Sequence, residues 1–167
     1  DWTGGSGQIN FSNISEYFAD SGTISTDVTP TGLRLAKFGQ SYSSSGSLTS
    51  STFNTGTDVT AYTTLTWQPT SQNPSTSAKF QIASTDDAAT TTWNYIGPDG
   101  TGSTYYTTPG ATISSANNSK RYFRYKVYLQ TDDSAQTPVI SSVNVNYVSG
   151  CFTPGQAMFP GLGNGFY

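Results

Sequence analysis

Residues 121–130 read Arg-Tyr-Phe-Arg-Tyr-Lys-Val-Tyr-Leu-Gln, and side chains of different character alternate along this stretch. A period of two places on one face Phe123, Tyr125, Val127 and Leu129. It places on the other face Tyr122, Arg124, Lys126, Tyr128 and Gln130. The alternation predicts a β-strand with one face in a hydrophobic core and the other in water.

The face predicted to meet water combines cations with aromatic rings. Tyr, Arg and Lys are ordinary residues on the wet side of an antiparallel sheet. Rings beside cations are also a feature of surfaces that bind sugars and polymers. Both interpretations stay open from the sequence, and we favour the ordinary one.

The rest of the chain shows strand signals and almost no helical periodicity. Further strands are predicted at residues 32–38, 46–53, 63–68, 78–84, 91–96, 103–108 and 139–148. Alternation directs inward the side chains of Leu33, Leu35, Leu65, Trp67, Phe80, Ile82, Val143, Val145 and Tyr147. Short strands separated by Gly, Pro, Asn, Asp and Ser clusters predict an all-β fold, namely a two-sheet antiparallel β-sandwich of the jelly-roll or Ig-like kind.

The sandwich domain is predicted to span residues 32–148. Residues 1–31 are weakly patterned, and we expect them to form an irregular N-terminal arm packed on the sandwich. Residues 149–167 are rich in Gly and Pro, and we interpret them as a C-terminal tail or as the start of a further module.

The composition indicates an environment. The 167 residues suit one domain that is long enough to bury a core. Charged residues make up 10% of the chain, against about a quarter in ordinary domains, whereas Ser and Thr together make up about 30%. Hydroxyl groups rather than charges therefore keep the chain soluble. This is typical of secreted and surface-displayed β proteins, so we expect an extracellular or cell-surface location.

Charge, hydropathy and cysteine content exclude several classes. The net charge of −3 and the pI of about 4.5 argue against nucleic acid as a partner, because that affinity needs a basic surface. No apolar run approaches the ~18 residues of a membrane-spanning helix. Cys151 is the single cysteine, so no disulfide can form within the chain. We interpret it as buried and inert, with a bond to another chain as the alternative.

Residues suited to catalysis or metal binding are scarce. With no His there is no Ser-His or Cys-His nucleophile system, and Glu16 is the single Glu available for a carboxylate pair. We therefore expect no enzyme activity, no catalytic residues and no cofactor. Calcium is a weaker hypothesis, because no calcium loop with its terminal Glu is present. Its oxygen ligands would come from Asp86, Asp87, Asp99, Asp132 and Asp133.

Two tryptophans lie in predicted strands. A Trp in a sandwich is ordinarily a core residue, whereas an exposed one can stack on a sugar ring. The sugar-binding hypothesis therefore places a ligand on Tyr122, Arg124, Tyr128 and whichever of Trp67 and Trp93 is exposed. Asn13 and Asn117 each begin an N-glycosylation sequence, which would make the chain a glycoprotein in a host that performs this modification.

Several segments, taken in order, resemble a known family. They are residues 46–56 (Gly-Ser-Leu-Thr-Ser-Ser-Thr-Phe-Asn-Thr-Gly), 64–67 (Thr-Leu-Thr-Trp), 79–82 (Lys-Phe-Gln-Ile), 93–101 (Trp-Asn-Tyr-Ile-Gly-Pro-Asp-Gly-Thr), 105–110 (Tyr-Tyr-Thr-Thr-Pro-Gly), 121–129 and 137–143 (Thr-Pro-Val-Ile-Ser-Ser-Val). Together they resemble a β-sandwich domain common in large bacterial and archaeal surface proteins, both adhesin-like and associated with pilins or pseudopilins. Asn54 stands where that family often has Asp. The resemblance implies extracellular display with adhesion or filament building, and it carries no catalytic residues to transfer.

Two functions from different classes follow. The first is a structural subunit or domain of a filament, pilus or adhesin, with copies of itself or other surface proteins as partners. Its assembly contacts would come from the apolar residues of the tail, which are Phe152, Met158, Phe159, Leu162, Phe166 and Tyr167. Residues 159–167 are also similar to the strand opening of carboxypeptidase-regulatory-like or Cna-B-like surface domains. The alternative function is a carbohydrate-binding module, with glycans as partners. From the sequence alone we favour the structural function.

Overall fold

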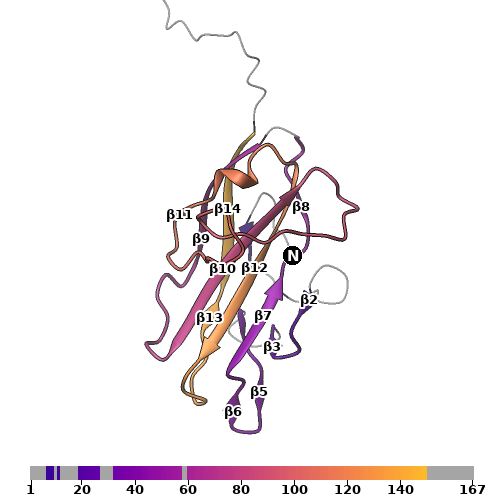
Figure 1. Ribbon diagram of the computed structural model, residues 1–167. Helices are drawn as coiled ribbons and strands as arrows, with labels where there is room; N and C mark the ends of the chain where they lie inside the picture. The colour runs from indigo at the N-terminus through magenta and orange to yellow at the C-terminus, as the bar shows by residue number, and fades with distance from the viewer. Residues whose placement is uncertain (1–6, 10, 12–18, 27–31, 58–59, 150–167) are drawn as a thin grey trace, which may run out of the picture.

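The computed structural model describes residues 7–9, 11, 19–26, 32–57 and 60–149 (Figure 1). Within these residues the chain forms β-strands, with one turn of 3₁₀ helix at Ser115–Asn117 and no α-helix. The all-β prediction is therefore confirmed. None of the described residues forms a helix with the length and apolar character needed to cross a membrane.

The described strands pair antiparallel and form two larger and two smaller sheets. The first sheet has the order β1 (Gly7–Gln8), β14 (Ser142–Ser149), β9 (Thr60–Gln68) and β11 (Ala111–Thr112). The second has the order β10 (Thr76–Thr85), β12 (Tyr122–Thr131), β7 (Ser45–Thr49) and β2 (Ala19–Asp20), and β8 (Phe53–Asn54) also pairs with β12. The smaller sheets are formed by β13 (Val139–Ile140), β4 (Leu33–Leu35) and β3 (Ile24–Ser25), and by the hairpin of β5 (Lys37–Phe38) and β6 (Ser41–Tyr42).

The strand predicted from residues 121–130 is β12, which lies between β10 and β7. Its burial alternates along its length, as the sequence pattern predicted. The side chains of Phe123, Tyr125, Val127 and Leu129 are buried. Its register with β10 runs without interruption from Thr131 opposite Thr76 to Tyr122 opposite Thr85.

Side chains of the first and second sheets meet in one hydrophobic core. The ring of Trp67 on β9 lies 4.5 Å from that of Phe80 on β10, measured between centroids. The core predicted from the sequence is confirmed, because one cluster contains Phe80, Ile82, Phe123, Tyr125, Val127, Leu129, Val143 and Val145. Tyr147 packs against this cluster and is partly buried. Each large apolar side chain removed from water contributes about 1.5–3 kcal/mol, so burial of this cluster is the main stabilising contribution.

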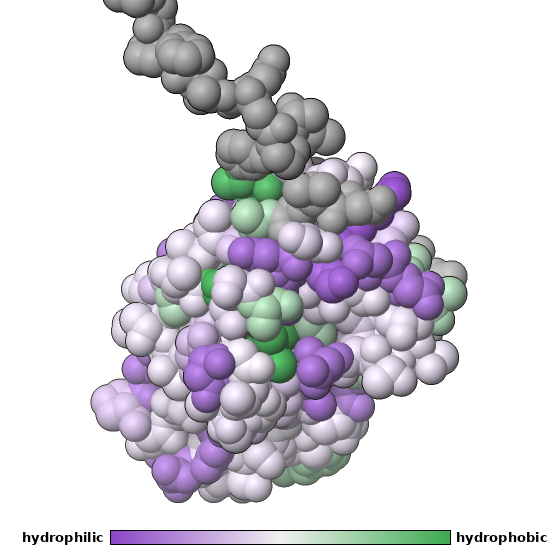
Figure 2. All heavy atoms as spheres, turned by 45° about the horizontal axis from the view of Figure 1, so that its top comes forward, coloured by the Kyte–Doolittle hydropathy of each residue, from purple (hydrophilic) through white to green (hydrophobic). Residues whose placement is uncertain are grey.

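The surface agrees with the composition. Figure 2 shows a face dominated by residues of intermediate hydropathy, with hydrophilic residues in separate patches and hydrophobic residues in small spots. Hydroxyl-bearing side chains of this kind interact with water without adding charge.

Two of the predicted strands, residues 91–96 and 103–108, are wrong. Each contributes a single bridge to β10, at Ile96 and at Tyr106. Backbone carbonyls in and beside the second segment bond the side chain of Gln81 instead of a neighbouring strand. Side chains that bond the backbone in this way compete with regular strand pairing.

Three other predicted strands, residues 32–38, 46–53 and 139–148, each divide into two shorter strands. The physical cause is clearest between β7 and β8. The Ser50 hydroxyl accepts a hydrogen bond from the Tyr125 N–H and donates one to the carbonyl oxygen of the next residue, both at 2.9 Å. A side chain there replaces a backbone partner, and the regular ladder stops.

The described residues before residue 32 supply β1, β2 and β3 to three different sheets. Gln8 on β1 is fully buried and accepts a hydrogen bond from the Tyr125 hydroxyl. Burial raises the pKa of Tyr125 well above its ordinary value, so this hydroxyl remains a donor. The N-terminal segment is thus connected to the core where it is described.

Candidate functional site

The second sheet has one face in the core and one face turned away from it, which we call the outer face. Its residues follow from the register of β10, β12 and β7. They are Ser77, Lys79, Gln81, Ala83, Thr85, Tyr122, Arg124, Lys126, Tyr128, Gln130, Ser45, Ser47 and Thr49. Direct pairing brings Lys79 beside Tyr128 and Gln81 beside Lys126. Side chains of such pairs stand about 4.5–5.5 Å apart at Cβ, so they interact directly.

The connection between β10 and β11, residues 86–110, covers part of the outer face (Figure 1). Gln81 and Ala83 belong to this face by alternation, yet only 3% and 0% of their surfaces are exposed. The connection meets the edge of β10 at two points, through single bridges at Ile96 and Tyr106. It therefore brings residues that are far from β12 in sequence onto the face of that strand.

Gln81 attaches the connection to the sheet. Its amide Nε2 donates to the carbonyl oxygens of Gly102 and Thr104, at 2.9 and 3.0 Å. Its Oε1 accepts a hydrogen bond from the Tyr128 hydroxyl at 2.8 Å. The one side chain thus links the connection, β10 and β12.

The part of the connection held by Gln81 is a closed turn at residues 97–105. Asp99 accepts hydrogen bonds from the N–H and the hydroxyl of Thr101, at 2.8 and 2.9 Å, and from the Thr104 hydroxyl. These bonds, that of Thr104 first, hold the pKa of the Asp99 carboxyl below its ordinary value. Glycine is required at Gly97, because a Cβ there would lie 2.2 Å from the Thr104 carbonyl oxygen.

Three cations of the outer face each lie over an aromatic ring. Distances to the ring centres are 4.0 Å from Lys79 Nζ to Tyr105, 4.5 Å from Arg124 Cζ to Trp93, and 5.2 Å from Lys126 Nζ to Tyr128. Each contact of this type contributes about 0.5–1 kcal/mol at an exposed site. Because two of the rings belong to the connection, these contacts both hold the connection and restrict the cations.

Two tyrosines of this region keep their hydroxyl protons to higher pH than an ordinary phenol. Burial raises the pKa of Tyr128, and the neighbouring rings of Tyr105 and Tyr95 raise it further. Burial also raises the pKa of Tyr95, against the opposing effect of the Arg124 guanidinium. Both phenols are neutral hydrogen-bonding groups at neutral pH, so the charge of the outer face comes from its lysines and arginine.

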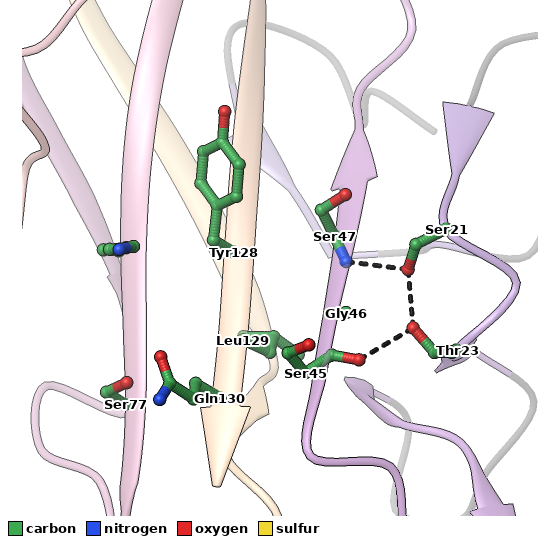
Figure 3. A pocket seen from close by; sticks show the side chains of 10 residues that line it. Ser21, Thr23, Ser45, Gly46, Ser47, Ser77, Tyr128, Leu129 and Gln130 are labelled. Atoms are coloured by element: carbon green, nitrogen blue, oxygen red, sulfur yellow. Dashed lines mark hydrogen bonds between the residues drawn. The ribbon is translucent and has the colours of Figure 1, made fainter. Parts of the chain in front are cut away.

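Beside Lys79 and Tyr128 the outer face contains a depression of about 400 Å³ (Figure 3). Its wall on the β7 side is fixed by hydrogen bonds. The hydroxyls of Ser21 and Thr23 bond each other at 2.7 Å, and each also bonds the backbone of β7, at 3.0 and 2.8 Å. Figure 3 shows the Tyr128 ring projecting from β12 above the depression.

Other polar groups in the depression have no hydrogen-bond partner within the described residues. They are the hydroxyls of Ser45, Ser47 and Ser77 and the amide of Gln130. Hydroxyls and amides both donate and accept hydrogen bonds. The depression therefore presents neutral hydrogen-bonding groups directly beside an aromatic ring and a cation.

The structure brings together most of the predicted ligand-binding residues. Tyr122, Arg124 and Tyr128 lie on the outer face, and half-buried Trp93 lies against it through its contact with Arg124. Trp67 is different, because it is 3% exposed and lies against Phe80 in the core. Its assignment as a ligand-binding residue is therefore wrong.

Sequence reasoning missed four residues that lie on or against this face. They are Lys79, Gln81, Tyr95 and Tyr105, whereas Lys126 was placed on this face but was not named as a ligand-binding residue. The signal for the first two was present, since alternation in residues 78–84 places them opposite the apolar positions. No signal placed the two tyrosines, because the path of the connection cannot be read from its local sequence.

Four of the five carboxylates considered as calcium ligands take part in other contacts. Asp86 forms an ion pair with Lys120 at 2.7 Å, and Asp87 and Asp133 each accept a backbone N–H two residues further on. Among the residues that the structure describes, no three His, Cys, Asp or Glu side chains come together. The calcium hypothesis gains no support from this part of the chain.

Two other expectations concern modification and assembly. Asn117 is 1% exposed, so the folded domain does not present its side chain for glycosylation. Asn13, Cys151 and all six apolar tail residues proposed for assembly lie outside the described residues.

Comparison of the chain with family models, curated proteins and solved structures found no match. The resemblance to sandwich domains of surface proteins therefore stays a prediction. The function has to be argued from the outer face itself.

Proposed function

We propose that this chain is a non-enzymatic carbohydrate-binding module of an extracellular surface protein, and that it binds glycan on its outer face. The observation that carries the proposal is the depression of about 400 Å³ beside Lys79 and Tyr128. Binding sites for small ligands combine a concave shape with apolar or aromatic surface and a few placed polar groups. The depression has these three properties.

The chemistry of sugars fits this arrangement. A sugar ring has apolar C–H faces, which aromatic rings can contact, and hydroxyls that both donate and accept hydrogen bonds. The Tyr128 ring supplies the aromatic contact, and the unpartnered hydroxyls of Ser45, Ser47 and Ser77 supply groups of the matching type. Bound water can complete such contacts without weakening them greatly.

For the architecture we propose a two-sheet β-sandwich. The two larger sheets support this, because Trp67 and Tyr62 of the first contact Phe80 and Phe123 of the second through their rings. Such a sandwich presents the outer face of one sheet as a continuous surface. The jelly-roll and Ig-like alternatives both remain compatible with this proposal.

We favour the glycan function over the filament function because the residues that would bind glycan lie in the part of the chain that the structure describes. Filament assembly rests on the segment 151–167, which lies outside the described residues, and it stays a prediction. The proposal assigns no catalytic step to any residue, in line with the absence of His and the single Glu in the sequence.

The test is affinity electrophoresis against a panel of plant, algal and bacterial polysaccharides, followed by calorimetry on any that retard the protein. Tyr128→Leu removes the ring at the depression and should weaken binding about two- to tenfold, because an aromatic contact contributes about 0.5–1.5 kcal/mol. The matched control is Tyr42→Leu, because Tyr42 also lies under a lysine, Lys37 at 5.3 Å, but on the β5–β6 hairpin.

The control variant should bind like the wild type, and circular dichroism should show that both variants are folded. If no polysaccharide retards the wild-type protein, the proposed function is wrong. It is also wrong if Tyr128→Leu and Tyr42→Leu leave the affinity equally unchanged.

A further inference from the structure

Within the proposed glycan-binding function, on which this inference rests, we propose that the outer face selects acidic polysaccharides whose sugars carry carboxylates. The observation is a separation of charge. The chain has a net charge of −3, yet the outer face presents Lys79, Arg124 and Lys126. The salt bridge found among the described residues joins Lys120 to Asp86, away from these three cations.

The three cations lack carboxylate partners within the described residues, and they contact rings instead. A cation over a ring keeps its full positive charge, because the ring supplies only a quadrupole. No carboxylate of the described residues forms an ion pair with them, so a ligand carboxylate could do so. An acidic sugar supplies such a carboxylate together with the C–H surface that suits the rings.

The spacing of the cations follows the strands. Arg124 and Lys126 are two residues apart on β12, so their Cα atoms lie about 7 Å apart on the same face. Lys79 lies opposite Tyr128, the next outward residue of β12 after Lys126. The positive charges therefore form a row along β12 that ends at the depression. A chain of sugars lying along this row would meet a cation and a ring at successive positions.

Arg124 is held in this row more firmly than the lysines. Its Nε donates to the Thr52 hydroxyl at 2.8 Å, and its guanidinium covers the Trp93 ring. The guanidinium group has five N–H donors, so further donors remain after the Thr52 bond. A carboxylate can accept two parallel hydrogen bonds from such a group.

The row does not suit nucleic acid. Binding to nucleic acid depends on neutralising many phosphates, and an acidic protein with three cations on one face supplies few. Acidic polysaccharides have fewer charges per length and offer a C–H surface beside each carboxylate. The bases of single-stranded nucleic acid also stack on aromatic rings, so what disfavours this ligand is the small number of cations on a chain of net negative charge.

The experiment compares three polymers that contain uronic acids, called polyuronates below, with the same polymers after chemical reduction of their carboxyl groups. They are polygalacturonate, alginate and hyaluronan. Calorimetry at two salt concentrations measures each affinity. At least one polyuronate should bind, its reduced form should bind at least about tenfold more weakly, and added salt should weaken only the charged polymer. The double variant Lys79→Gln/Lys126→Gln should lose about four- to twentyfold in affinity for the polyuronate and little for the reduced polymer.

The control is Lys37→Gln, which removes one positive charge, half the change in the double variant, on the β5–β6 hairpin, where Lys37 is exposed. It should leave the affinity for the polyuronate unchanged. If it lowers the free energy of binding by half as much as the double variant or more, the interaction is general charge attraction and the inference is overturned.

The other outcomes separate the inference from the function on which it rests. If a polyuronate and its reduced form bind equally well, glycan binding stands and the acidic preference is overturned. If neither the polyuronate nor its reduced form binds above background, and no neutral polysaccharide binds, the proposed function fails as well. If single-stranded DNA binds as tightly as the polyuronate, the face recognises polyanions without regard to sugar, which also overturns the inference.

Discussion

Replacing Gln81 with Met is a direct test of how the connection is held on the outer face. Met is close to Gln in length and volume, so the change keeps most of the packing and removes the hydrogen bonds. Those bonds run to the carbonyls of Gly102 and Thr104, at 2.9 and 3.0 Å, and from the Tyr128 hydroxyl, at 2.8 Å. At a net value of about 1 kcal/mol each, their loss should lower the free energy of unfolding by about 3 kcal/mol.

The loss of stability should be greatest around the connection, in addition to the change for the whole domain. The N–H groups of Ile96 and Tyr106 donate to carbonyls of β10, each at 2.9 Å, and they report whether the connection stays on the sheet. Urea denaturation measures the global change, and amide hydrogen exchange measures protection at these two positions. In the Gln81→Met variant both amides should exchange by local opening rather than by global unfolding.

Gln72→Met is the matched control. Gln72 exchanges two hydrogen bonds with the backbone of Val139, both at 2.9 Å, and takes no part in holding the connection. The control should lose about 2 kcal/mol of stability while Ile96 and Tyr106 keep exchange that tracks global unfolding. The reasoning is refuted if Gln81→Met changes stability by less than about 0.5 kcal/mol, or if both variants expose the two amides equally.

Three further predictions concern the core, the pH dependence and the tail. Phe123→Ala should lower the free energy of unfolding by about 3–5 kcal/mol in urea denaturation, because the side chain is fully buried, and a loss below about 1 kcal/mol would contradict the described core. The free energy of unfolding should also fall in alkali, because burial raises the folded-state pKa of Tyr62, Tyr125 and Tyr128. The contribution of these phenols to stability is complete below the unfolded pKa near 10 and is lost as pH rises through the folded values. The loss is at most about 1.4 kcal/mol per group per pH unit. Denaturation curves at pH 8 and pH 11 that coincide would show that these phenols are not buried. Deleting residues 151–167 should abolish any self-assembly seen by electron microscopy while the domain stays folded, and a deletion that unfolds the domain would make the tail part of the fold.

Much of the fold could be predicted because alternation is a local signal. The pattern of residues 121–130 fixed both faces of β12, and the patterns around Leu65, Phe80 and Val143 likewise directed these side chains into the core. In each case the free energy of burying one face exceeds that of any competing local arrangement. A one-residue slip would expose every apolar side chain of the strand, so the register is strongly determined.

The limits of the strands were less predictable, because single side chains decide them. The Ser50 hydroxyl ends β7 by bonding the backbone of Tyr125, a residue far away in the sequence. The prediction of a strand at 103–108 failed for a related reason, since Gln81 bonds carbonyls in and beside that segment. Hydroxyl and amide side chains are common throughout this chain, and nothing local marks the few that replace backbone partners.

The candidate site could be predicted only in part for the same physical reason. The cations and rings of β12 followed from its alternation, but Trp93 and Tyr105 reach the outer face through a connection whose path depends on Gln81. The two tryptophans also shared one interpretation in the sequence, since both lay in predicted strands. Burial separated them, with Trp67 in the core and Trp93 half-buried against Arg124.

The contact of each cation with a ring would lower the entropic cost of the proposed glycan binding. Ordering a long side chain on association costs about 0.5–1.5 kcal/mol, and lysine and arginine have many rotamers to lose. On the outer face Lys79 is already restricted by Tyr105, and Arg124 by both Trp93 and Thr52, before any ligand arrives. Part of the entropic cost is therefore met during folding, and a carboxylate that reaches these groups gains more of its interaction energy as affinity. A sheet whose cations extended freely into water would have the same charge and more rotamers to lose, so under the proposed function the connection would contribute to binding by ordering these cations.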